Sequence, residues 1–428
     1  MTTTDLCSPD VTTQAFTLTP DQQNALSAFS QFLCDPRESA FVLSGFSGCG
    51  KTTLVKTLLT KLPYFLATAR LIEAGIPNYN VELTATTNKA AENLTSITGT
   101  QARTIHSFLG LRLVPVDIRK REYRLEPKNG NQVTNTILFI DEASFVNPEL
   151  LGLIFKLTDP KSCKIVFVGD PAQLLQPKSN SAPVFDAKFC GAALTQVVRQ
   201  AEGNPIVDLS TQFRHTVSTG VWPQFKPDGH HVQYLTGDQF KAAILKEFGR
   251  PDWRYHDSKV LGFTNDFVEQ ANMFIRNHVE GSPHLEVGDY AVCNSFVQLG
   301  KSSIKTDQLV HITGIEPQTR SGVAGVLYTI DYAIHAFMPE SRQAKAQRIK
   351  EAKARNEMSL LWDMEQTWID LRPVFAQTIN KSQGSTYDKV FIDLDDVSRC
   401  HVGDQIARML YVGVSRARNH VYLTGDIA

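Results

Sequence analysis

The sequence predicts an α/β protein whose short parallel strands are covered by helices, with two inserted regions of antiparallel character. Short apolar or β-branched runs alternate with helical patterns along most of the chain, which is typical of parallel sheets. One of these runs ends in a glycine-rich turn that opens the next helical pattern. Two regions lack this alternation and contain strand patterns joined by turns. At about 150 residues per domain, the 428 residues suggest roughly three domains.

The first helix and most of the strands have clear local signals. Residues 19–33 begin with a T-x-x-Q capping box formed by Thr19 and Gln22, with Pro20 at the first helical position. A short apolar strand follows at 41–43. Further strands are predicted at 81–83, 136–140, 164–168, 259–263, 389–393 and 421–423.

The first inserted region is predicted to be a β-hairpin. Basic and apolar residues alternate between 107 and 133, and the stretch ends in the turn sequence Lys-Asn-Gly-Asn. Residues 101–130 hold seven basic and three acidic residues, a net charge of +4.

The second inserted region, 284–372, is predicted to be a small antiparallel barrel followed by helices. Its helical half contains apolar residues at helical spacing, namely Met358, Leu361, Met364, Trp368 and Leu371. Residues 341–355 carry six basic residues and one acidic residue. That basic helix is interpreted either as a solvated face or as a contact for a polyanion.

These patterns divide the chain into three parts. The first domain is expected at 1–178, with the hairpin inserted at 107–133. The second is expected at 179–282 and 373–428. The third, at 283–372, is inserted into the second.

The composition excludes several classes of protein. Hydrophobic residues make up 42% and charged residues 20%, which excludes a disordered, collagen-like or disulfide-scaffold chain. The formal charge of −1 argues against a polybasic protein, but nucleic-acid binding stays possible because charge can be segregated on the surface. Seven scattered cysteines without a C-x-x-C pair predict a reduced protein without a cysteine zinc site. No signal peptide and no membrane-spanning run is recognised, so a soluble cytoplasmic protein is expected.

A phosphate-binding loop follows the strand at 41–43. Residues 45–52 fit G-x-x-x-x-G-K-[ST], in which Gly45, Gly48 and Gly50 let backbone N–H groups point at phosphate oxygens. Lys51 would bring a positive charge to the β- and γ-phosphates, and the Thr52 hydroxyl would bind Mg²⁺. The sequence therefore predicts ATP and Mg²⁺ as ligands, with Thr53 as a further nucleotide-binding candidate.

Two later strand ends supply candidates for the hydrolysis reaction. Asp141 and Glu142 follow the strand at 136–140. Asp141 would hold Mg²⁺ through water, and Glu142 would orient and deprotonate the attacking water. Gln173 follows the strand at 164–168 within Gly-Asp-Pro-Ala-Gln-Leu and is the candidate to sense the γ-phosphate.

Further motifs occur in a recognisable order. They are Leu-Thr-Pro-Asp-Gln-Gln at 18–23, Thr-Ala-Thr-Thr-Asn-Lys-Ala-Ala at 84–91, Thr-Ile-His-Ser at 104–107, Leu-Thr-Gln-Val-Val-Arg-Gln at 194–200, Thr-Ile-Asn-Lys-Ser-Gln-Gly at 378–384 and Tyr-Val-Gly-Val-Ser-Arg-Ala-Arg at 411–418. In this order the chain resembles superfamily 1 helicases of the 5′→3′ branch, the RecD/Dda-like group, and within it the Dda-type helicases of tailed bacteriophages. The resemblance extends from about residue 18 to residue 424.

The resemblance implies two RecA-like domains, a hairpin that acts as a strand-separating pin, and an SH3-like barrel with a helical extension. It implies an ATP-dependent DNA helicase that translocates 5′→3′ on single-stranded DNA and unwinds duplex DNA, in phage replication or recombination. The implied partners are single-stranded and forked duplex DNA, with single-strand-binding or replication proteins as further candidates, and a monomer is expected.

The resemblance also implies roles for individual residues. Gln22 would read adenine, Arg199 would contact the γ-phosphate, and Arg416 would be a second arginine finger. The implied nucleic-acid contacts are Thr87, Asn88, Thr104, His106, Tyr123, Thr378, Asn380 and Ser382. Tyr123 is interpreted either as a pin residue that stacks on a base or as a packing residue between the strands.

Two departures from the family pattern and two alternatives stay open. Asn380 stands where histidine is usual, and Thr86 stands where proline is usual, so an altered contact with the nucleic-acid strand is expected. One alternative is an RNA helicase of the same superfamily. The other is a nucleic-acid-stimulated ATPase that acts as a clamp or switch without unwinding. An inactive ATPase is disfavoured because Lys51, both acids and both arginines are present.

Overall fold

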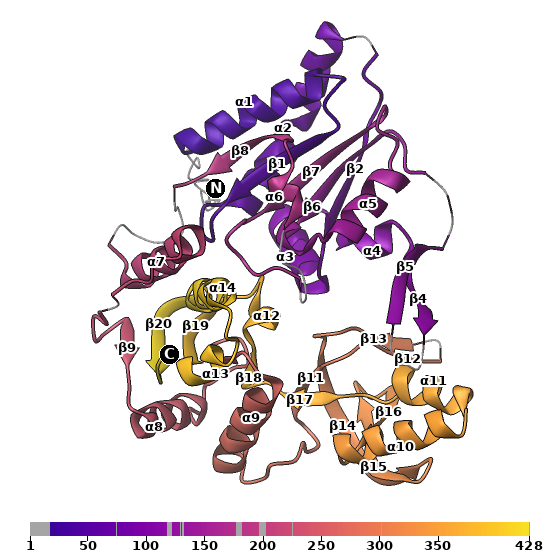
Figure 1. Ribbon diagram of the computed structural model, residues 1–428, viewed down its shortest axis with the longest axis vertical. Coiled ribbons are helices and arrows are strands. Elements are labelled where there is room, and N and C mark those ends of the chain that lie inside the picture. The colour runs from indigo at the N-terminus through magenta and orange to yellow at the C-terminus, as the bar shows by residue number, and fades with distance from the viewer. Residues whose placement is uncertain are drawn as a thin grey trace, which may run out of the picture.

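The structure is a computed structural model that describes residues 18–73, 75–117, 122–128, 130, 132–176, 182–196, 203–224, 226–300 and 302–427. Figure 1 shows two parallel-sheet units, a hairpin and an antiparallel unit with two helices. None of the helices in these described ranges is long and apolar enough to cross a membrane.

The first unit is a six-stranded parallel sheet in the order β3-β2-β6-β7-β1-β8. Its strands are β1 (Ala40–Gly45), β2 (Asn80–Ala85), β3 (Ala102–Thr104), β6 (Thr136–Asp141), β7 (Cys163–Gly169) and β8 (Cys190–Leu194). Its helices are α1 (Pro20–Cys34), α2 (Lys51–Ile72), α3 (Asn88–Thr98), α4 (Ile105–Phe108), α5 (Pro148–Leu157) and α6 (Pro183–Asp186), with a short 3₁₀ helix at Ala143–Phe145. All seven residues of β7 are buried, as expected for a strand with helices on both faces. The predicted capping box of α1 is confirmed.

The expected domain boundary at residue 178 is wrong by one strand. β8 lies beyond that boundary, yet it pairs in parallel with β1 from Phe41–Cys190 to Gly45–Leu194. The chain therefore returns to the first sheet before it enters the second unit at α7 (Pro205–Thr219). The sequence of β8, Cys-Gly-Ala-Ala-Leu, is too small and too weakly β-branched to be recognised as a strand.

The second unit is a five-stranded parallel sheet in the order β18-β10-β19-β20-β9. Its strands are β9 (Val232–Tyr234), β10 (Ser258–Gly262), β18 (Ala376–Thr378), β19 (Tyr387–Asp393) and β20 (Ala417–Thr424). Besides α7, its helices are α8 (Gly237–Phe248), α9 (Asn265–Val279), α12 (Ile379–Ser382), α13 (Leu394–Ser398) and α14 (Gly403–Val414). The predicted parallel α/β class is therefore confirmed for both units.

Two antiparallel strands lie between α4 and β6, in the stretch for which a hairpin is predicted. Strands β4 (Leu111–Asp117) and β5 (Glu122–Pro127) pair antiparallel, from Leu111–Pro127 to Asp117–Glu122. Residues 118–121, which join the two strands, lie outside the described residues.

The third unit is a five-stranded antiparallel sheet in the order β16-β15-β14-β11-β17, accompanied by the two-stranded sheet β12-β13. Its strands are β11 (Tyr290–Cys293), β12 (Val297–Leu299), β13 (Ser302–Ile304), β14 (Leu309–Arg320), β15 (Val323–Ile330), β16 (Ile334–Pro339) and β17 (Leu371–Pro373). Helices α10 (Arg342–Ala354) and α11 (Met358–Gln366) lie between β16 and β17.

The helical pattern predicted over residues 358–371 is only partly correct. Helix α11 ends at Gln366, and Leu371 belongs to β17, where it pairs with Cys293. Trp368 packs against Phe337 with ring centroids 4.8 Å apart, whereas Leu371 packs in the core of the antiparallel sheet. Trp368 and Leu371 are thus buried by different elements, although their spacing matches a helix. A periodic pattern of apolar residues alone does not distinguish these two cases.

Candidate active site

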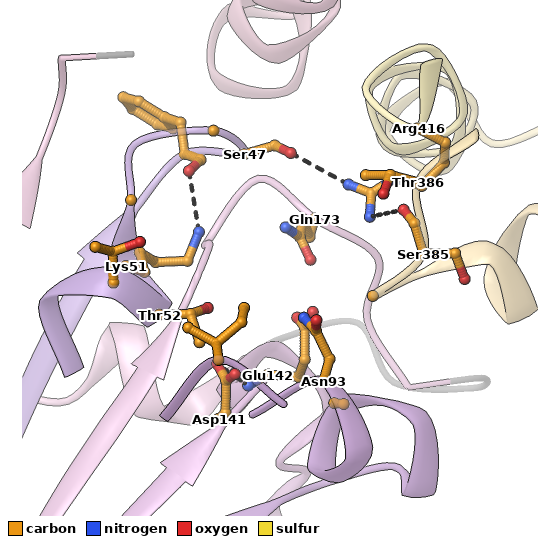
Figure 2. Close-up of a pocket in the computed structure, with 17 residues that line it drawn as sticks. Ser47, Lys51, Thr52, Asn93, Asp141, Glu142, Gln173, Ser385, Thr386 and Arg416 are labelled. Atoms are coloured by element: carbon orange, nitrogen blue, oxygen red, sulfur yellow. Dashed lines mark hydrogen bonds between the residues drawn. The ribbon is translucent and has the colours of Figure 1, made fainter. Parts of the chain in front are cut away.

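A cavity of about 340 Å³ lies between the phosphate-binding loop and the second unit. Figure 2 shows side chains from both units pointing into it. The predicted residues that line it are Gly48, Gly50, Lys51, Thr52, Thr53, Asp141, Glu142, Gln173 and Arg416. Residues 384–386 also line the cavity. The structure thus brings together most of the residues predicted for nucleotide hydrolysis.

The loop between β1 and α2 has the backbone that phosphate binding requires. Gly48 and Gly50 have φ angles of 84° and 77°, in the left-handed region that glycine adopts without strain. A Cβ at Gly45 would lie 2.9 Å from the Cβ of Leu194, so the close approach of β8 requires glycine there. The Lys51 ammonium donates to the carbonyl oxygens of Gly45 at 2.7 Å and Phe46 at 3.0 Å.

The acid pair lies at the carboxyl end of β6. Burial, with the neighbouring Glu142 charge as the second cause, raises the pKa of Asp141 to about 7. Glu142 has a φ of 53°, a left-handed conformation that is strained for a residue other than glycine. The Thr86 hydroxyl donates to the carbonyl oxygen of Glu142 at 3.1 Å and so supports this conformation. A proline at position 86 could not make that bond, which gives the departure at Thr86 a structural reason.

Arg416 follows the end of α14 and reaches the loop of the first unit. Its side chain is buried, and its guanidinium donates to the Ser47 hydroxyl at 3.2 Å and to the Ser385 carbonyl at 3.2 Å (Figure 2). Arginine is always charged, so this position brings a fixed positive charge to the cavity.

Tyr411 and Gln383 of the second unit also contact the first unit, and neither residue was assigned a role from the sequence. The Tyr411 hydroxyl accepts from the Ser47 backbone N–H at 2.8 Å and donates to the Asp170 carboxylate at 2.5 Å. Burial, with the Asp170 charge as a further cause, raises the pKa of Tyr411 well above its usual value. Gln383 donates to the Gln173 amide oxygen at 2.6 Å and to the Glu142 carboxylate at 3.2 Å. The sequence feature that could have identified Tyr411 and Gln383 as functional is their position inside the motifs at 411–418 and 378–384.

The predicted adenine contact Gln22 is not among the residues that line the cavity. Gln22 is fully buried, where its amide oxygen accepts from the Thr19 backbone N–H at 3.1 Å and its amide nitrogen donates to the Cys49 carbonyl at 3.4 Å. Both ends of the side chain are therefore bonded within the protein, and its adenine contact stays a prediction. Arg199 lies outside the described residues.

Three predicted nucleic-acid contacts share one position in the fold. Thr87, Thr104 and Thr378 are the N-caps of α3, α4 and α12, and each hydroxyl accepts a backbone N–H of the helix that follows. Each comes directly after the carboxyl end of a parallel strand or within two residues of it. Helix N-termini of this kind favour anions such as phosphate groups.

The other predicted contacts are placed differently. Asn88, His106 and Asn380 are half-buried, and burial lowers the pKa of His106. Ser382 is fully buried, and its hydroxyl donates to the Ile379 carbonyl at 2.7 Å. Tyr123 lies in β5, and its side chain is outside the described part of the structure.

The side chains fit a magnesium nucleotide. The Thr52 hydroxyl and the Asp141 carboxylate are hard oxygen donors, which Mg²⁺ prefers, and both line the cavity. Lys51 and Arg416 provide positive charge on opposite sides of it. A triphosphate with its metal ion therefore matches the donors that are present.

Comparisons with known protein families and sequences agree with this arrangement. Residues 17–221 match the AAA domain family, and residues 373–424 match the UvrD-like helicase C-terminal domain. The ATP-dependent DNA helicase dda of Enterobacteria phage T4 is 26% identical over 458 residues, which cover 95% of this chain and 98% of that protein. The ATP-dependent RecD2 DNA helicase of Deinococcus radiodurans is 29% identical over 212 residues, which cover 49% of this chain and 26% of that protein.

Comparisons with solved structures show the fold. A Pif1 helicase from Bacteroides, in complex with ADP-AlF3 and ssDNA, has a TM-score of 0.50 at 18% identity and covers 96% of this chain and 93% of that one. The Pif1 helicase from Candida albicans has the same TM-score and identity and covers 96% and 95%. The two parallel sheets thus correspond to the two RecA-like domains of these structures. With its motifs in the family's order and these matches along most of its length, the chain is similar to the superfamily 1 helicases of the Dda/Pif1/RecD-like group.

Proposed function

We propose that the protein is an ATP-dependent DNA helicase that translocates 5′→3′ on single-stranded DNA and unwinds duplex DNA. The observation that carries the proposal is the cavity between the two parallel sheets, where Lys51, Glu142 and Gln173 of the first unit face Arg416 of the second. A nucleotide held there touches both units, so its hydrolysis can change how they are placed relative to each other. The similarity to the DNA helicases of phage T4 and Deinococcus radiodurans supports DNA as the track.

The proposed chemistry assigns one task to each side chain in the cavity. The loop N–H groups and Lys51 bind the triphosphate, and Gln173 contacts the γ-phosphate. Glu142 accepts a proton from the attacking water, whose oxygen forms a bond to the γ-phosphorus while the bond to the bridging oxygen breaks and ADP leaves. Thr52 and Asp141 would hold Mg²⁺, which supplies positive charge beside the β- and γ-phosphates.

Arg416 makes the reaction depend on closure of the two units. Its guanidinium is bonded to Ser47 of the loop, next to the position of the γ-phosphate in our assignment. If the guanidinium exchanges this hydrogen bond for one to the nucleotide, it can neutralise the charge that develops on the γ-phosphoryl group during hydrolysis. Arg199 would be the second arginine of this kind, as the family resemblance implies.

The DNA strand would cross both parallel sheets at the carboxyl ends of their strands. Thr87, Thr104 and Thr378 occupy helix N-termini at those ends, on the first unit and on the second. When the contacts of one unit hold the DNA strand while those of the other unit move, each ATP turnover advances the protein along the strand. Asn380 would contact the strand in place of the usual histidine.

The remaining parts take the roles that the family resemblance implies. The first domain would extend to Leu194, the second would comprise residues 205–282 and 373–428, and residues 283–372 would form an SH3-like domain with a helical extension. The hairpin β4-β5 would be the pin that separates the strands at a fork. Forked duplex DNA would then be the substrate, in phage replication or recombination.

The test compares unwinding of duplexes that carry a 5′ or a 3′ single-stranded tail, with ATP hydrolysis measured in parallel. We expect unwinding of the 5′-tailed duplex and hydrolysis stimulated by single-stranded DNA. Lys51→Ala, which removes the cation at the phosphates, should lower hydrolysis on the order of 10²-fold or more. Preference for the 3′ tail would refute the polarity, stimulation by RNA alone would refute DNA as the track, and an active Lys51→Ala variant would refute the mechanism.

A further inference from the structure

Gln383 directly follows α12 and contacts the first unit across the cavity wall. Its amide nitrogen is 2.6 Å from the Gln173 amide oxygen and 3.2 Å from the Glu142 carboxylate. The side chain is 6% exposed, so these bonds form out of contact with bulk water, where hydrogen bonds to a charged group are strong. One amide of the second unit thus touches both the proposed base and the proposed γ-phosphate sensor.

We propose that Gln383 is a positioning residue that makes the orientation of Glu142 and Gln173 depend on the DNA-contacting segment of the second unit. The inference rests on the proposed function and deepens it. Gln383 is bonded through one peptide to α12, the four-residue helix that carries Asn380. A DNA strand that holds α12 in this position therefore also holds Gln383, and with it the hydrogen bond to the base.

The Glu142 carboxylate depends on this contact. Within the described ranges, no other side chain donates a hydrogen bond to it, since the remaining bonds of Glu142 are made by its backbone. Thr86 fixes the backbone of Glu142 from within the first unit, whereas Gln383 fixes its side chain from the second. The first unit alone therefore places the backbone of Glu142, whereas the orientation of its carboxylate also depends on the second unit.

The amide of Gln383 is not explained by stability. Its nitrogen must face Glu142, because its oxygen would repel the carboxylate in that place. The oxygen is left buried, and no described residue donates to it. A buried acceptor without a donor costs free energy, and this cost offsets part of what the bonds to Glu142 and Gln173 contribute to folding. What the amide adds is the pair of contacts to Glu142 and Gln173.

The experiment uses Gln383→Met, which keeps the length of the side chain and removes the amide. With saturating single-stranded DNA we expect kcat for ATP hydrolysis to fall about 10- to 100-fold, as is typical when the partner that orients a catalytic group is lost. The KM for ATP and the DNA concentration for half-maximal stimulation should stay within roughly threefold, because the contact acts on the base and not on either ligand. The melting temperature should change little, because the variant loses the bonds to Gln173 and Glu142 but also the cost of the unpaired oxygen.

The matched control is Gln377→Met. Gln377 lies in β18, six residues earlier, and its amide donates to the Tyr387 hydroxyl at 2.7 Å within the second unit. This variant loses an amide of the same size but should keep the kcat of the wild type. Gln383→Ala serves as a second variant should the methionine pack poorly, and the same pattern is expected.

The outcomes separate this inference from the proposed function. A wild-type kcat in Gln383→Met, a loss that appears in KM alone, or an equal loss in Gln377→Met would each overturn the positioning role. If the wild type shows no DNA-stimulated hydrolysis, or if Lys51→Ala is active, the proposed function itself fails. A DNA-stimulated wild type with an unaffected Gln383→Met variant would leave the helicase standing and remove only the role of Gln383.

Discussion

At the scale of single residues, the acid pair at the end of β6 is placed for chemistry at the expense of stability. Asp141 is buried beside a second carboxyl group, and Glu142 has a left-handed backbone. Both features raise the free energy of the folded protein, and both are explained by the ligand they await. A bound divalent cation would lower the pKa of Asp141 and so reduce the cost of burying its carboxylate beside Glu142.

Replacing Asp141 by asparagine should therefore stabilise the protein in the absence of Mg²⁺ and nucleotide. The pKa of Asp141 is about 7 in the folded state, against 3.8 for an ordinary aspartate. The folded state thus binds the proton more tightly, so its relative stability is greatest below pH 3.8 and is lost as the pH rises through 7. Asp141→Asn lacks this loss, and its free energy of unfolding at pH 8 should exceed that of the wild type by on the order of 1 kcal/mol or more.

Chemical denaturation at pH 5 and pH 8 checks this expectation. The stabilisation should be larger at pH 8, and hydrolysis should be lost at both values. A destabilised variant, or an equal gain at both pH values, would show that Asp141 is ionised in the folded protein without a metal ion.

At the scale of elements, the hairpin β4-β5 is a short insertion in the first unit, and α12 is a short helix between β18 and β19 of the second. The hairpin leaves the first unit between α4 and β6, and Figure 1 shows it pointing toward the third unit. Outside the hairpin, the Leu125 backbone N–H donates to the Glu149 side chain of α5 at 3.3 Å. This bond joins the hairpin to α5, a helix that does not line the nucleotide cavity, so a pin role at a DNA fork would be separate from the hydrolysis site.

Tyr123→Ala should accordingly reduce unwinding more than it reduces ATP hydrolysis. A tyrosine that stacks on a base contributes about 1–3 kcal/mol, and its loss affects the step at the fork, whereas hydrolysis is stimulated by the strand between the two parallel sheets. Strand separation and DNA-stimulated hydrolysis are measured on the same variant. Tyr123→Phe keeps the ring and should behave as the wild type. Equal losses in both activities of Tyr123→Ala would exclude a role as the pin.

At the scale of the whole molecule, α12 joins all three units. Gln383 reaches the first unit, as described above, and Lys381 reaches the third. The Lys381 ammonium donates to the Asn294 side chain at 2.6 Å and pairs with Asp307 at 2.7 Å. Asn294 in turn donates to Asp370 at 2.7 Å. A motion of α12 is therefore transmitted both toward the nucleotide and toward the antiparallel unit.

Lys381→Met should loosen the third unit and lower unwinding more than hydrolysis. The variant removes one ion pair and two hydrogen bonds, at a cost of about 1–2 kcal/mol for a partly exposed group. Hydrogen exchange should increase in the segments that follow β11 and β13, where Asn294 and Asp307 lie. The exposed Lys305 of the same unit provides the control, since Lys305→Met should change neither activity. Unchanged exchange together with a normal unwinding rate would show that the third unit is held by other contacts.

The sequence alone determined the parts of the site that depend on local spacing. The loop at 45–52, the acid pair and the capping box of α1 each need a few residues at fixed intervals, and the structure forms the loop and the capping box as predicted and places the acid pair at the cavity. The parallel α/β class followed from alternation, which is likewise a property of neighbouring residues.

Only the tertiary structure decided which segments far apart in the chain contact one another. β8 joins the first sheet through pairing with β1, the Thr86 hydroxyl reaches Glu142, and Gln383 touches side chains more than two hundred residues away. No spacing along the chain encodes these contacts, because they exist only once two sheets have formed and packed against each other. The sequence therefore specified which groups could do the chemistry, and the packing of the two sheets decided which of them act on one another.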